Sequence, residues 1–433
     1  MSSQAVSMKL QQIAQQAQDN PEMVFMTLAH HMDVEFLEHA FYQLRRKSVP
    51  GIDKVTWKDY KSDLHENLTD LHGRLVAKRY RAQPAKRSYI PKDDNEKRAL
   101  SIWCLEDKIV QSAVALLLSA VYEQDFYDFS FGFRKGKSCH QALAHLDREY
   151  FANNINWIID ADIRKFFDTI DHKKLIEVIR KRMNDGSLIR LIGKWLHVEV
   201  LEAEGELIKA AEGTPQGAVI SPLLANIFLH EVLDEWFIKT VKPCMKGRSF
   251  IVRYADDFVI GCESKDEAER LMDVLIDRFA QYGLMIHPKK SKLVKMGRPG
   301  RGKPKDRSNG SFDYLGFTHY LGISRKGYWV LKKKTRSGKI KAILSNIQDY
   351  CKRNRHKPLE KQHEKLTQKL RGHYNYFGVR YNYRHIATVQ HKIIRIWYKW
   401  LKRRGHKSKM TWDKMNRILE IFPLPKPRIS ARI

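Results

Sequence analysis

The amino-acid sequence predicts an α+β fold in which a body of mixed helices and β-hairpins precedes a helical appendage. Apolar runs with turn residues between them indicate hairpins in three places, at 81–102, 249–262 and 312–323. Helical periodicity fills much of the chain between the hairpins and, from about Ser337, nearly all of the remaining sequence. Since 433 residues exceed what one compact core normally holds, we expect two or three lobes.

The first 80 residues predict helices interrupted by one loop. Helical patterns cover 1–46, with a break at an asparagine-proline pair, and resume over 58–80. Between them, 48–57 contains a proline-glycine pair that is typical of a loop. In the hairpin after these helices, both arms carry basic residues.

Helices and strands alternate through the rest of the body. An apolar run within 155–170 is typical of a buried strand that leads into a helix, and 212–237 indicates a loop that opens a long apolar helix. Further helices are predicted over 105–123, 138–151, 172–200 and 264–283. In the appendage, 383–404 spaces apolar residues by three and four, which predicts a helix with one buried face. These residues are Ile386, Val389, Ile393, Trp397 and Trp400.

The positive charge is concentrated at the end of the chain. The net charge is +30, yet from Leu321 onward there are 31 Lys and Arg against 5 Asp and Glu. The first 320 residues hold 48 basic and 44 acidic side chains and are nearly neutral. Because solubility alone does not require such asymmetry, we expect the basic quarter to bind a polyanion.

Several classes of protein are disfavoured. The five cysteines form no C-x-x-C pair, so neither a zinc site nor a disulfide framework is indicated. No apolar run reaches the length of a membrane span, and the polar N-terminus does not resemble a secretory signal. We therefore expect a cytoplasmic protein with no membrane partner.

Two adjacent carboxylates, Asp256 and Asp257, lie between apolar strands and are the most informative feature for function. Charged groups beside such strands are costly unless they are neutralised, and Mg²⁺ prefers a few carboxylates plus phosphate oxygens. An ordinary polar turn is the alternative. Asp162 follows another buried strand, as a two-metal site for phosphoryl transfer requires. Asp160 and Asp168 are rival carboxylates, and residue chemistry alone does not choose among the three.

Eight motifs then appear in the order found in group II intron-encoded reverse transcriptases, and the sequence resembles that family over about 45–428. They are GID (51–53), IPK (90–92), FGFRKGKSCHQAL (131–143), DADIRKFFDTIDH (160–172), GTPQGAVISPLLANIFL (213–229), YADD (254–257), GLMIHPKKSK (283–292) and YLGF (314–317). The resemblance implies a right-hand polymerase of fingers, palm and thumb. Its implied activity is RNA-directed DNA synthesis from a DNA primer with dNTPs and two Mg²⁺ ions, for which Mn²⁺ is a substitute. Its implied RNA partners are the template and the parent intron RNA, whose splicing and retromobility the protein promotes.

The resemblance also implies roles for individual residues. Asp162, Asp256 and Asp257 become the catalytic metal ligands, with Asp162 preferred because it precedes Phe167 by five residues. Phe167 becomes the side chain that excludes a ribose 2′-hydroxyl, whereas Phe166 is assigned to packing. The remaining nucleotide-binding positions are Gln216, beside the new base pair, and Lys92 and Lys108, which bind triphosphate.

The resemblance divides the chain into four regions: an N-terminal helical extension at 1–44, fingers and palm at 45–330, a helical thumb and maturase region at 331–404, and a short basic extension at 405–433. The chain lacks the paired cysteines of an H-N-H nuclease, so it resembles the endonuclease-less members. Basic candidates for RNA binding are Lys86, Arg87, Lys332, Lys333, Lys334, Arg403 and Arg404.

Two alternative functions stay open. One is an RNA-binding splicing factor with an inactive polymerase, which the retained carboxylates disfavour. The other is a domesticated reverse transcriptase in defence or repair, which a gene neighbourhood without intron RNA domains would favour.

Overall fold

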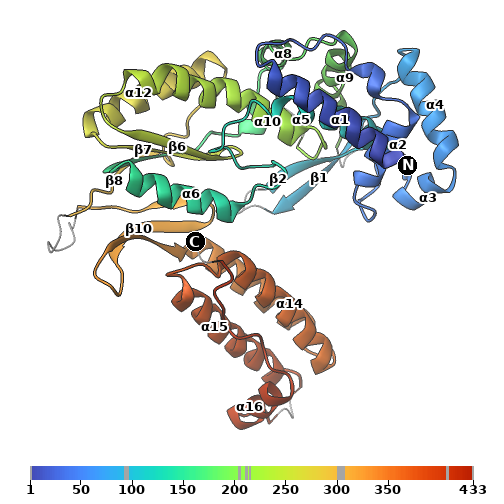
Figure 1. Ribbon diagram of the computed structural model, residues 1–433. Helices are drawn as coiled ribbons and strands as arrows, with labels where there is room; N and C mark the ends of the chain where they lie inside the picture. Colours follow the sequence, from blue (N-terminus) through green and yellow to red (C-terminus); the bar gives the residue numbers. More distant parts are fainter. Residues whose placement is uncertain are drawn as a thin grey trace.

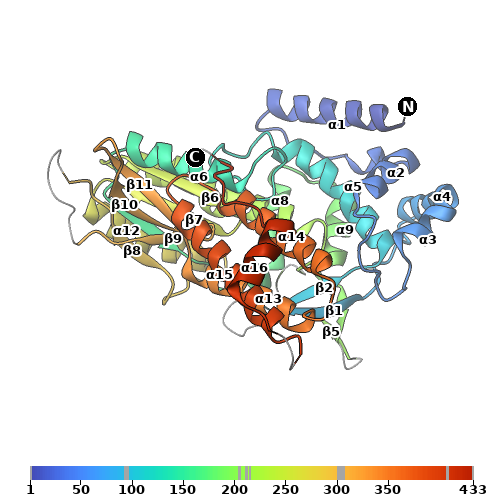
Figure 2. The same ribbon diagram turned by 90° about the horizontal axis from the view of Figure 1, so that it is seen from below.

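The computed structural model describes residues 2–91, 97–202, 206–209, 213, 216–299, 308–405 and 409–431. Within these residues, a body of three β-sheets and covering helices carries four C-terminal helices that project from one side (Figure 1). Viewed from below, the C-terminal helices lie across the middle of the body (Figure 2). The mixed fold predicted from the sequence is confirmed.

The central sheet carries the two adjacent aspartates. Its antiparallel strands run in the order β6 (Ser249–Tyr254), β7 (Asp257–Cys262), β3 (Trp157–Ala161) and β8 (Lys292–Lys295). Ile158 and Ile159 are neighbours on β3 and are both fully buried, yet they belong to different hydrophobic cores. Successive side chains of a strand point to opposite faces, so both faces of this sheet are covered. That coverage explains why its strands are continuously apolar in sequence.

Helices cover the two faces. The helix α6 (Cys139–Ala152) packs on β6, and α12 (Lys265–Gln281) packs on β3 and β7 from the other side. The body contains the further helices α1 (Ser2–Asp19), α2 (Val34–Gln43), α3 (Trp57–Ser62), α4 (Leu64–Val76), α5 (Leu105–Tyr122), α7 (Phe166–Thr169), α8 (His172–Arg180), α9 (Gly186–Leu196), α10 (Ser221–Leu229) and α11 (Lys242–Cys244), with a short 3-10 turn at Ala29–His31. Between α10 and α11 the chain continues through the π-helical segments η3 (His230–Glu235) and η4 (Phe237–Val241).

The second sheet has the order β2 (Lys97–Ile102), β1 (Ala85–Pro91), β4 (Glu199–Leu201) and β5 (Leu207–Lys209). The β1–β2 hairpin confirms the prediction, although its expected turn falls outside the described residues. The expected single helix over 172–200 is wrong. Asp185 caps the start of α9 by accepting from the amides of Ser187 and Leu188, so two helices form, and the segment ends in β4.

The third sheet joins the body to the appendage. Its order is β11 (Trp329–Thr335), β10 (Phe317–Ile323) and β9 (Phe312–Tyr314). The sequence placed a helical region from 331, but 331–335 belong to β11. Pairing with β10 over seven residues determines this, and local periodicity carries no sign of that partner.

The appendage consists of α13 (Ser337–Arg353), α14 (Leu359–Phe377), α15 (Tyr383–Lys402) and α16 (Trp412–Ile421). All five residues of the predicted apolar face on α15 are buried in the core of these helices, which confirms that prediction. After α16 the chain returns to the connection between α14 and α15, where the amide of Ser430 donates to the carbonyl of Gly378 at 2.7 Å. Among the described residues, no helix combines the length and apolarity needed to cross a membrane.

Candidate active site

The adjacent aspartates lie at the tip of the β6–β7 hairpin. Tyr254 pairs with Asp257 across the hairpin, so Ala255 and Asp256 form the two-residue turn. Ala255 has a φ of 57°, which is unfavourable for a residue with a Cβ. Tight turns of this kind normally use glycine, so the surrounding structure must hold this one in place.

A buried ion pair holds the turn from behind. Arg253 and Asp234 are both fully buried, and the Nε and Nη2 atoms of Arg253 donate to the Asp234 carboxylate. Another guanidinium nitrogen donates to the carbonyl of Ala255 at 3.1 Å and to the side chain of Asn226 at 2.9 Å. Although burial opposes ionisation, the charge of Arg253 lowers the pKa of Asp234 below its ordinary value. The strained turn is therefore anchored to the π-helical segment that carries Asp234.

Gly132 supports the same turn through a close backbone contact. A Cβ built on Gly132 would lie 2.1 Å from the backbone nitrogen of Ala255, so only glycine fits there. The side-chain amide of Asn226 donates to the carbonyl of Gly132 at 2.6 Å. Asn226 thus joins Gly132 to Arg253, and three separate motifs of the sequence meet behind one turn.

Four carboxylates gather around the hairpin tip. Burial, and then the charge of Asp162, raise the pKa of Asp256. Burial raises the pKa of Asp257 to about 7, with further contributions from Asp256 and Asp160. Burial also raises the pKa of Asp160 to about 6. Crowded carboxylates of this kind are stabilised by a cation, because it removes both the repulsion and the desolvation cost.

The structure separates the rival carboxylates. Asp160 lies within β3, 3.8 Å from the ammonium of Lys292, and accepts a long bond from the amide of Asp313. Asp162 follows β3 and has a half-exposed side chain, 3.8 Å from the ammonium of Lys290. Asp168 instead accepts a hydrogen bond from the side chain of Gln216 at 3.2 Å. Asp160 and Asp162 therefore lie beside the hairpin pair, whereas Asp168 has a different partner.

The oxygen donors fit a divalent cation of the Mg²⁺ type, which is hard and takes carboxylates, water and phosphate oxygens. No group of three His, Cys, Asp or Glu side chains within the described ranges is arranged to hold a metal by itself. The carboxylates therefore suit a metal ion whose remaining ligands are water and the phosphate oxygens of a bound nucleotide, as is common for Mg²⁺.

Gly213 and Gly217 each approach a neighbouring backbone segment closely. Gly213 has a φ of 89°, and a Cβ there would lie 2.7 Å from the carbonyl of Phe167. Gly217 has a φ of 112°, and a Cβ there would lie 2.4 Å from the carbonyl of Ser101. The amide of Ser101 donates to the carbonyl of Gln216 at 2.6 Å. Gly213 thus lies against α7, and Gln216 and Gly217 lie against the β1–β2 hairpin. On α7, Phe167 is half-buried whereas Phe166 is 2% exposed.

Comparison with known families agrees with this geometry. The family model described as reverse transcriptase (RNA-dependent DNA polymerase) matches residues 90–319. This range contains the β6–β7 hairpin with Asp256 and Asp257, the carboxylates Asp160 and Asp162, and the glycines Gly213 and Gly217. The chain belongs to the reverse transcriptase family. Its body and appendage accordingly form the right-hand arrangement expected of that family.

Relatives place the chain near group II intron proteins. The group II intron-encoded protein LtrA of Lactococcus lactis subsp. cremoris is 35% identical over 235 residues, which are 53% of this chain and 38% of LtrA. The protein YkfC of Escherichia coli K12 is 33% identical over 257 residues, 51% of this chain and 66% of YkfC. The chain therefore matches between about a third and two thirds of the length of these relatives. The resemblance to group II intron-encoded reverse transcriptases is confirmed.

A solved telomerase structure from Candida albicans, in complex with a fragment of telomeric RNA, is a more distant likeness. It matches at a TM-score of 0.43 and 14% identity, covering 82% of this chain and 67% of that one. A likeness at this distance adds nothing to the family assignment.

The basic residues that the sequence assigned to the fingers differ in their surroundings in this reverse transcriptase chain. Lys92 lies outside the described residues. Lys86 is exposed on β1, whereas Arg87 is paired with Glu202 at 3.1 Å. Lys108 is 9% exposed and its ammonium donates to the carbonyl of Val49 at 2.9 Å, so the expected triphosphate contact of Lys108 is disfavoured in this conformation.

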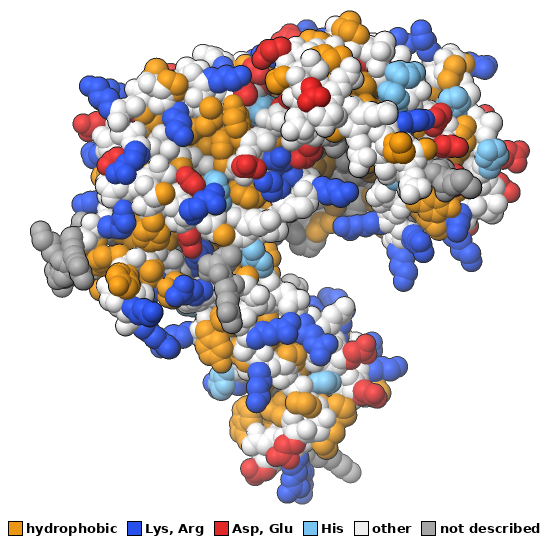
Figure 3. Space-filling model, viewed as in Figure 1, with side chains coloured by type: hydrophobic (Ala, Val, Ile, Leu, Met, Phe, Trp, Pro, Cys, Tyr) orange, Lys and Arg blue, Asp and Glu red, His pale blue; other side chains and the backbone are white. Residues whose placement is uncertain are grey.

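The predicted RNA-binding residues of the appendage also differ from one another. Lys333 is fully buried and paired with Asp147, so the expectation that it faces RNA is wrong. Arg404 donates to the carbonyls of Arg355 and Lys357 and so ties α15 to the α13–α14 connection. Lys334 and Arg403 are exposed, and Lys332 is partly exposed. Figure 3 shows the molecule hollowed between body and appendage, with Lys and Arg side chains on both sides of the hollow.

Sequence reasoning missed two residues at the site. Arg98 lies on β2, and its positive charge partly offsets the burial that raises the pKa of Asp256, so Arg98 lies within electrostatic reach of the β6–β7 hairpin tip. The sequence feature that could have indicated Arg98 is its place among the basic residues of the second arm of the β1–β2 hairpin. Tyr376 on α14 donates to the carbonyl of Leu315 at 3.0 Å, and the amide of Leu315 donates to Asp257 at 3.3 Å. No local pattern reveals that contact, because Tyr376 and Leu315 are 61 residues apart.

Proposed function

We propose that this chain is an RNA-directed DNA polymerase that extends a DNA primer on an RNA template from dNTPs. The observation that supports the proposal is the gathering of the hairpin carboxylates Asp256 and Asp257 with Asp162, which follows the neighbouring strand. In this proposal residues 45–330 supply fingers and palm, 331–404 the thumb, and 405–433 a basic extension.

Metal binding in the proposal uses Asp162, Asp256 and Asp257 as ligands for two Mg²⁺ ions, with Mn²⁺ as a substitute. When bound, the metal ions lower the pKa of the primer 3′-hydroxyl and neutralise charge on the leaving pyrophosphate. The protein's own part is positional: Arg253 and Gly132 fix the turn that presents Asp256. Lys290 lies beside Asp162 and balances its charge before a nucleotide arrives.

Nucleotide selection is assigned to the surface between α7 and the 213–217 loop. In the proposal, the half-buried ring of Phe167 borders the position where a ribose 2′-hydroxyl would lie, while Gln216 borders the new base pair. Arg98 is placed to bind the triphosphate, because a guanidinium matches phosphate oxygens and its charge already reaches Asp256.

Binding of a parent group II intron RNA, with roles in its splicing and retromobility, is the further part of the proposal. It is supported by the basic C-terminal quarter and by relatives whose names are group II intron-encoded protein and, in Arabidopsis thaliana, nuclear intron maturase 4. The latter is 28% identical over 216 residues, 46% of this chain and 26% of the relative.

The test is primer extension on an RNA template with Mg²⁺, using Asp256→Asn and the exposed α12 control Asp273→Asn. Loss of a metal ligand removes several kcal/mol of transition-state stabilisation, so extension by the first variant falls by about a thousandfold or more. The control keeps wild-type extension. Robust extension by a folded Asp256→Asn variant contradicts the assignment of the site, and no extension by the folded wild type on any RNA template contradicts the activity.

A further inference from the structure

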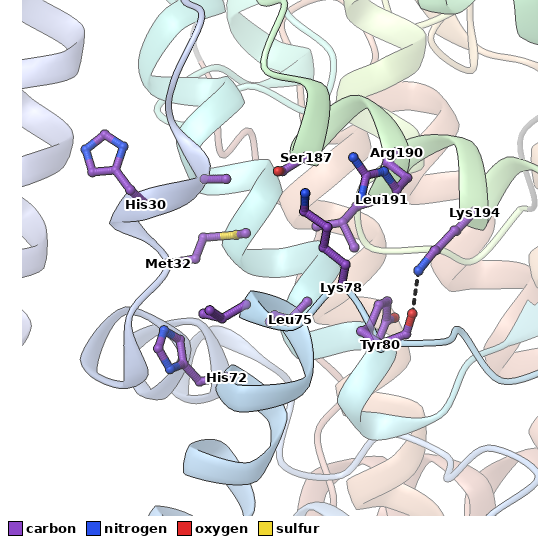
Figure 4. Close-up of a pocket in the computed structure, with 12 residues that line it drawn as sticks. His30, Met32, His72, Leu75, Lys78, Tyr80, Ser187, Arg190, Leu191 and Lys194 are labelled. Atoms are coloured by element: carbon purple, nitrogen blue, oxygen red, sulfur yellow. Dashed lines mark hydrogen bonds between the residues drawn. The ribbon is translucent and has the colours of Figure 1, made fainter.

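A cavity lies at the end of the body away from the β6–β7 hairpin (Figure 1). Its volume is about 420 Å³, and it is lined by the segment at Ala29–Met32, by α4 with the residues just after it, and by α9 (Figure 4). The side chains of Met32, Leu75 and Leu191 give it an apolar wall. A volume of this size suits a small organic ligand.

Apart from Tyr80, the ionisable side chains that line this cavity are all basic. His30, His72, Lys78, Arg190 and Lys194 line it, and none of its described lining residues is acidic. Over the described chain, no ion pair involves Lys78, Arg190 or Lys194. The ammonium of Lys194 donates to the carbonyl of Tyr80, which fixes its direction at one side of the cavity (Figure 4).

The carboxylates next to the cavity already have other partners. Asp33 is bonded to the ammonium of Lys9 at 2.6 Å. Asp185 accepts from the amides of Leu28 and Ala29 at 2.6 and 2.8 Å while it caps α9. The same contacts hold the wall at Ala29 against α9, so the shape of the cavity is fixed by the fold. Among the described residues, no carboxylate forms an ion pair with the lysines and the arginine of the cavity.

The unpaired positive charges favour an anionic ligand, and the apolar wall beside them favours a ligand that also has an apolar part. Burial, and then the charges of Arg190 and Arg81, lower the pKa of Lys194, and an anion between these groups would reverse that effect. An arginine and lysines suit phosphate oxygens. Inorganic phosphate alone would leave the apolar wall uncovered, whereas a base and ribose would cover it.

We propose that this cavity binds a nucleoside phosphate, either free or as one nucleotide of an RNA strand, with the phosphate on Lys78 and Arg190 and the base against Met32 and Leu75. The site is separate from the polymerase site and does not depend on the proposed activity. It would give the N-terminal part of the chain a binding role of its own.

The experiment measures binding of two probes, adenosine 5′-monophosphate and a single-stranded RNA dodecamer, by calorimetry on the full chain without divalent metal. One variant combines Lys78→Glu with Arg190→Glu. A second, Val76→Trp, fills the cavity without a change of charge, at a side chain that is 68% exposed at the end of α4. The control combines Lys58→Glu with Lys242→Glu, two exposed lysines outside the cavity with the same total charge change.

The expected result is that both cavity variants weaken at least one probe by about tenfold, a difference that corresponds to one charge-assisted contact, while the control does not. Loss of nucleotide binding identifies a free ligand, and loss of RNA binding alone identifies a nucleotide within a strand. The proposal is overturned if Val76→Trp leaves both affinities unchanged, because nothing then enters the cavity. It is also overturned if the control weakens binding as much as the cavity variants do. Since no polymerisation occurs without metal, neither outcome depends on catalytic activity.

Discussion

Gly132 and Ala255 pack backbone against backbone, with room for no side chain between them, since a Cβ on Gly132 would lie 2.1 Å from the Ala255 nitrogen. Ala255 is the residue of the hairpin turn with positive φ, and its carbonyl is bonded to the buried Arg253. The turn that presents Asp256 is thus held by long-range contacts, since its own sequence does not favour that backbone conformation.

Gly132→Ala is expected to lower the free energy of unfolding by about 1–3 kcal/mol, because backbone atoms must move to admit the methyl group. Primer extension should fall further than this loss explains, since the displaced atoms carry Asp256. Chemical denaturation and extension rates measure the two effects. The control is Gly372→Ala on α14, where a Cβ meets nothing within 4 Å and helix propensity should add stability. Wild-type extension by Gly132→Ala would show that the turn tolerates displacement.

Phe167→Ala is expected to raise incorporation of ribonucleotides relative to deoxynucleotides by about tenfold or more, because it opens space beside the sugar. The measurement is the ratio of kcat/KM for a matched rNTP and dNTP. Phe166→Ala is the comparison: this ring is 2% exposed, so its loss should cost about 3–5 kcal/mol of stability and leave the ratio unchanged. An unchanged ratio in an active Phe167→Ala enzyme would assign Phe167 to packing.

Tyr376→Phe removes the hydroxyl that bonds the carbonyl of Leu315, whose amide bonds Asp257. We expect kcat for primer extension to fall while KM for dNTP stays constant, because the carboxylate is less firmly placed and the nucleotide contacts are intact. The stability loss should be only about 0.5–1.5 kcal/mol. The exposed Tyr383→Phe on α15 is the control. A change in stability without a change in kcat would limit Tyr376 to a structural role.

Charge reversal of Lys332 and Lys334 is expected to weaken binding to structured RNA and to flatten its salt dependence. If each lysine contacts one phosphate, the slope of log K against log[salt] should decrease by about 1.5. Lys333→Met should leave the slope unchanged and instead cost about 3–5 kcal/mol of stability, since Asp147 would lose its buried partner. Salt titrations and denaturation separate the two. Equal slopes in the wild type and the Lys332 and Lys334 variant would place the RNA elsewhere.

Much of the body could be predicted because the decisive signals are local. The β6–β7 hairpin is indicated by two apolar runs with turn residues between them, and α15 by apolar residues at helical spacing. The carboxylates Asp256 and Asp257 stand out because charge is costly beside such strands. The preference for Asp162 came from the family resemblance, and its role there stays a prediction.

The errors arise where a distant partner decides the structure. Val200 was expected to be helical, yet it forms a strand because β4 pairs in parallel with β1, more than a hundred residues earlier. Three consecutive lysines look alike in sequence, yet Lys333 is buried because side chains alternate along β11 and Asp147 lies beneath it.

The fold class, the hairpin with its two aspartates, and the concentration of positive charge in the last quarter can be inferred from the amino-acid sequence, since periodicity and composition are properties of neighbouring residues. Which carboxylates meet, which lysines remain exposed, and how Ala255 is held at a positive φ become clear only in the folded molecule. Those outcomes depend on contacts between segments far apart in the chain, whose energies exist only once the sheets and helices have packed. The joining of Gly132, Asn226 and Arg253 behind one turn is the clearest case.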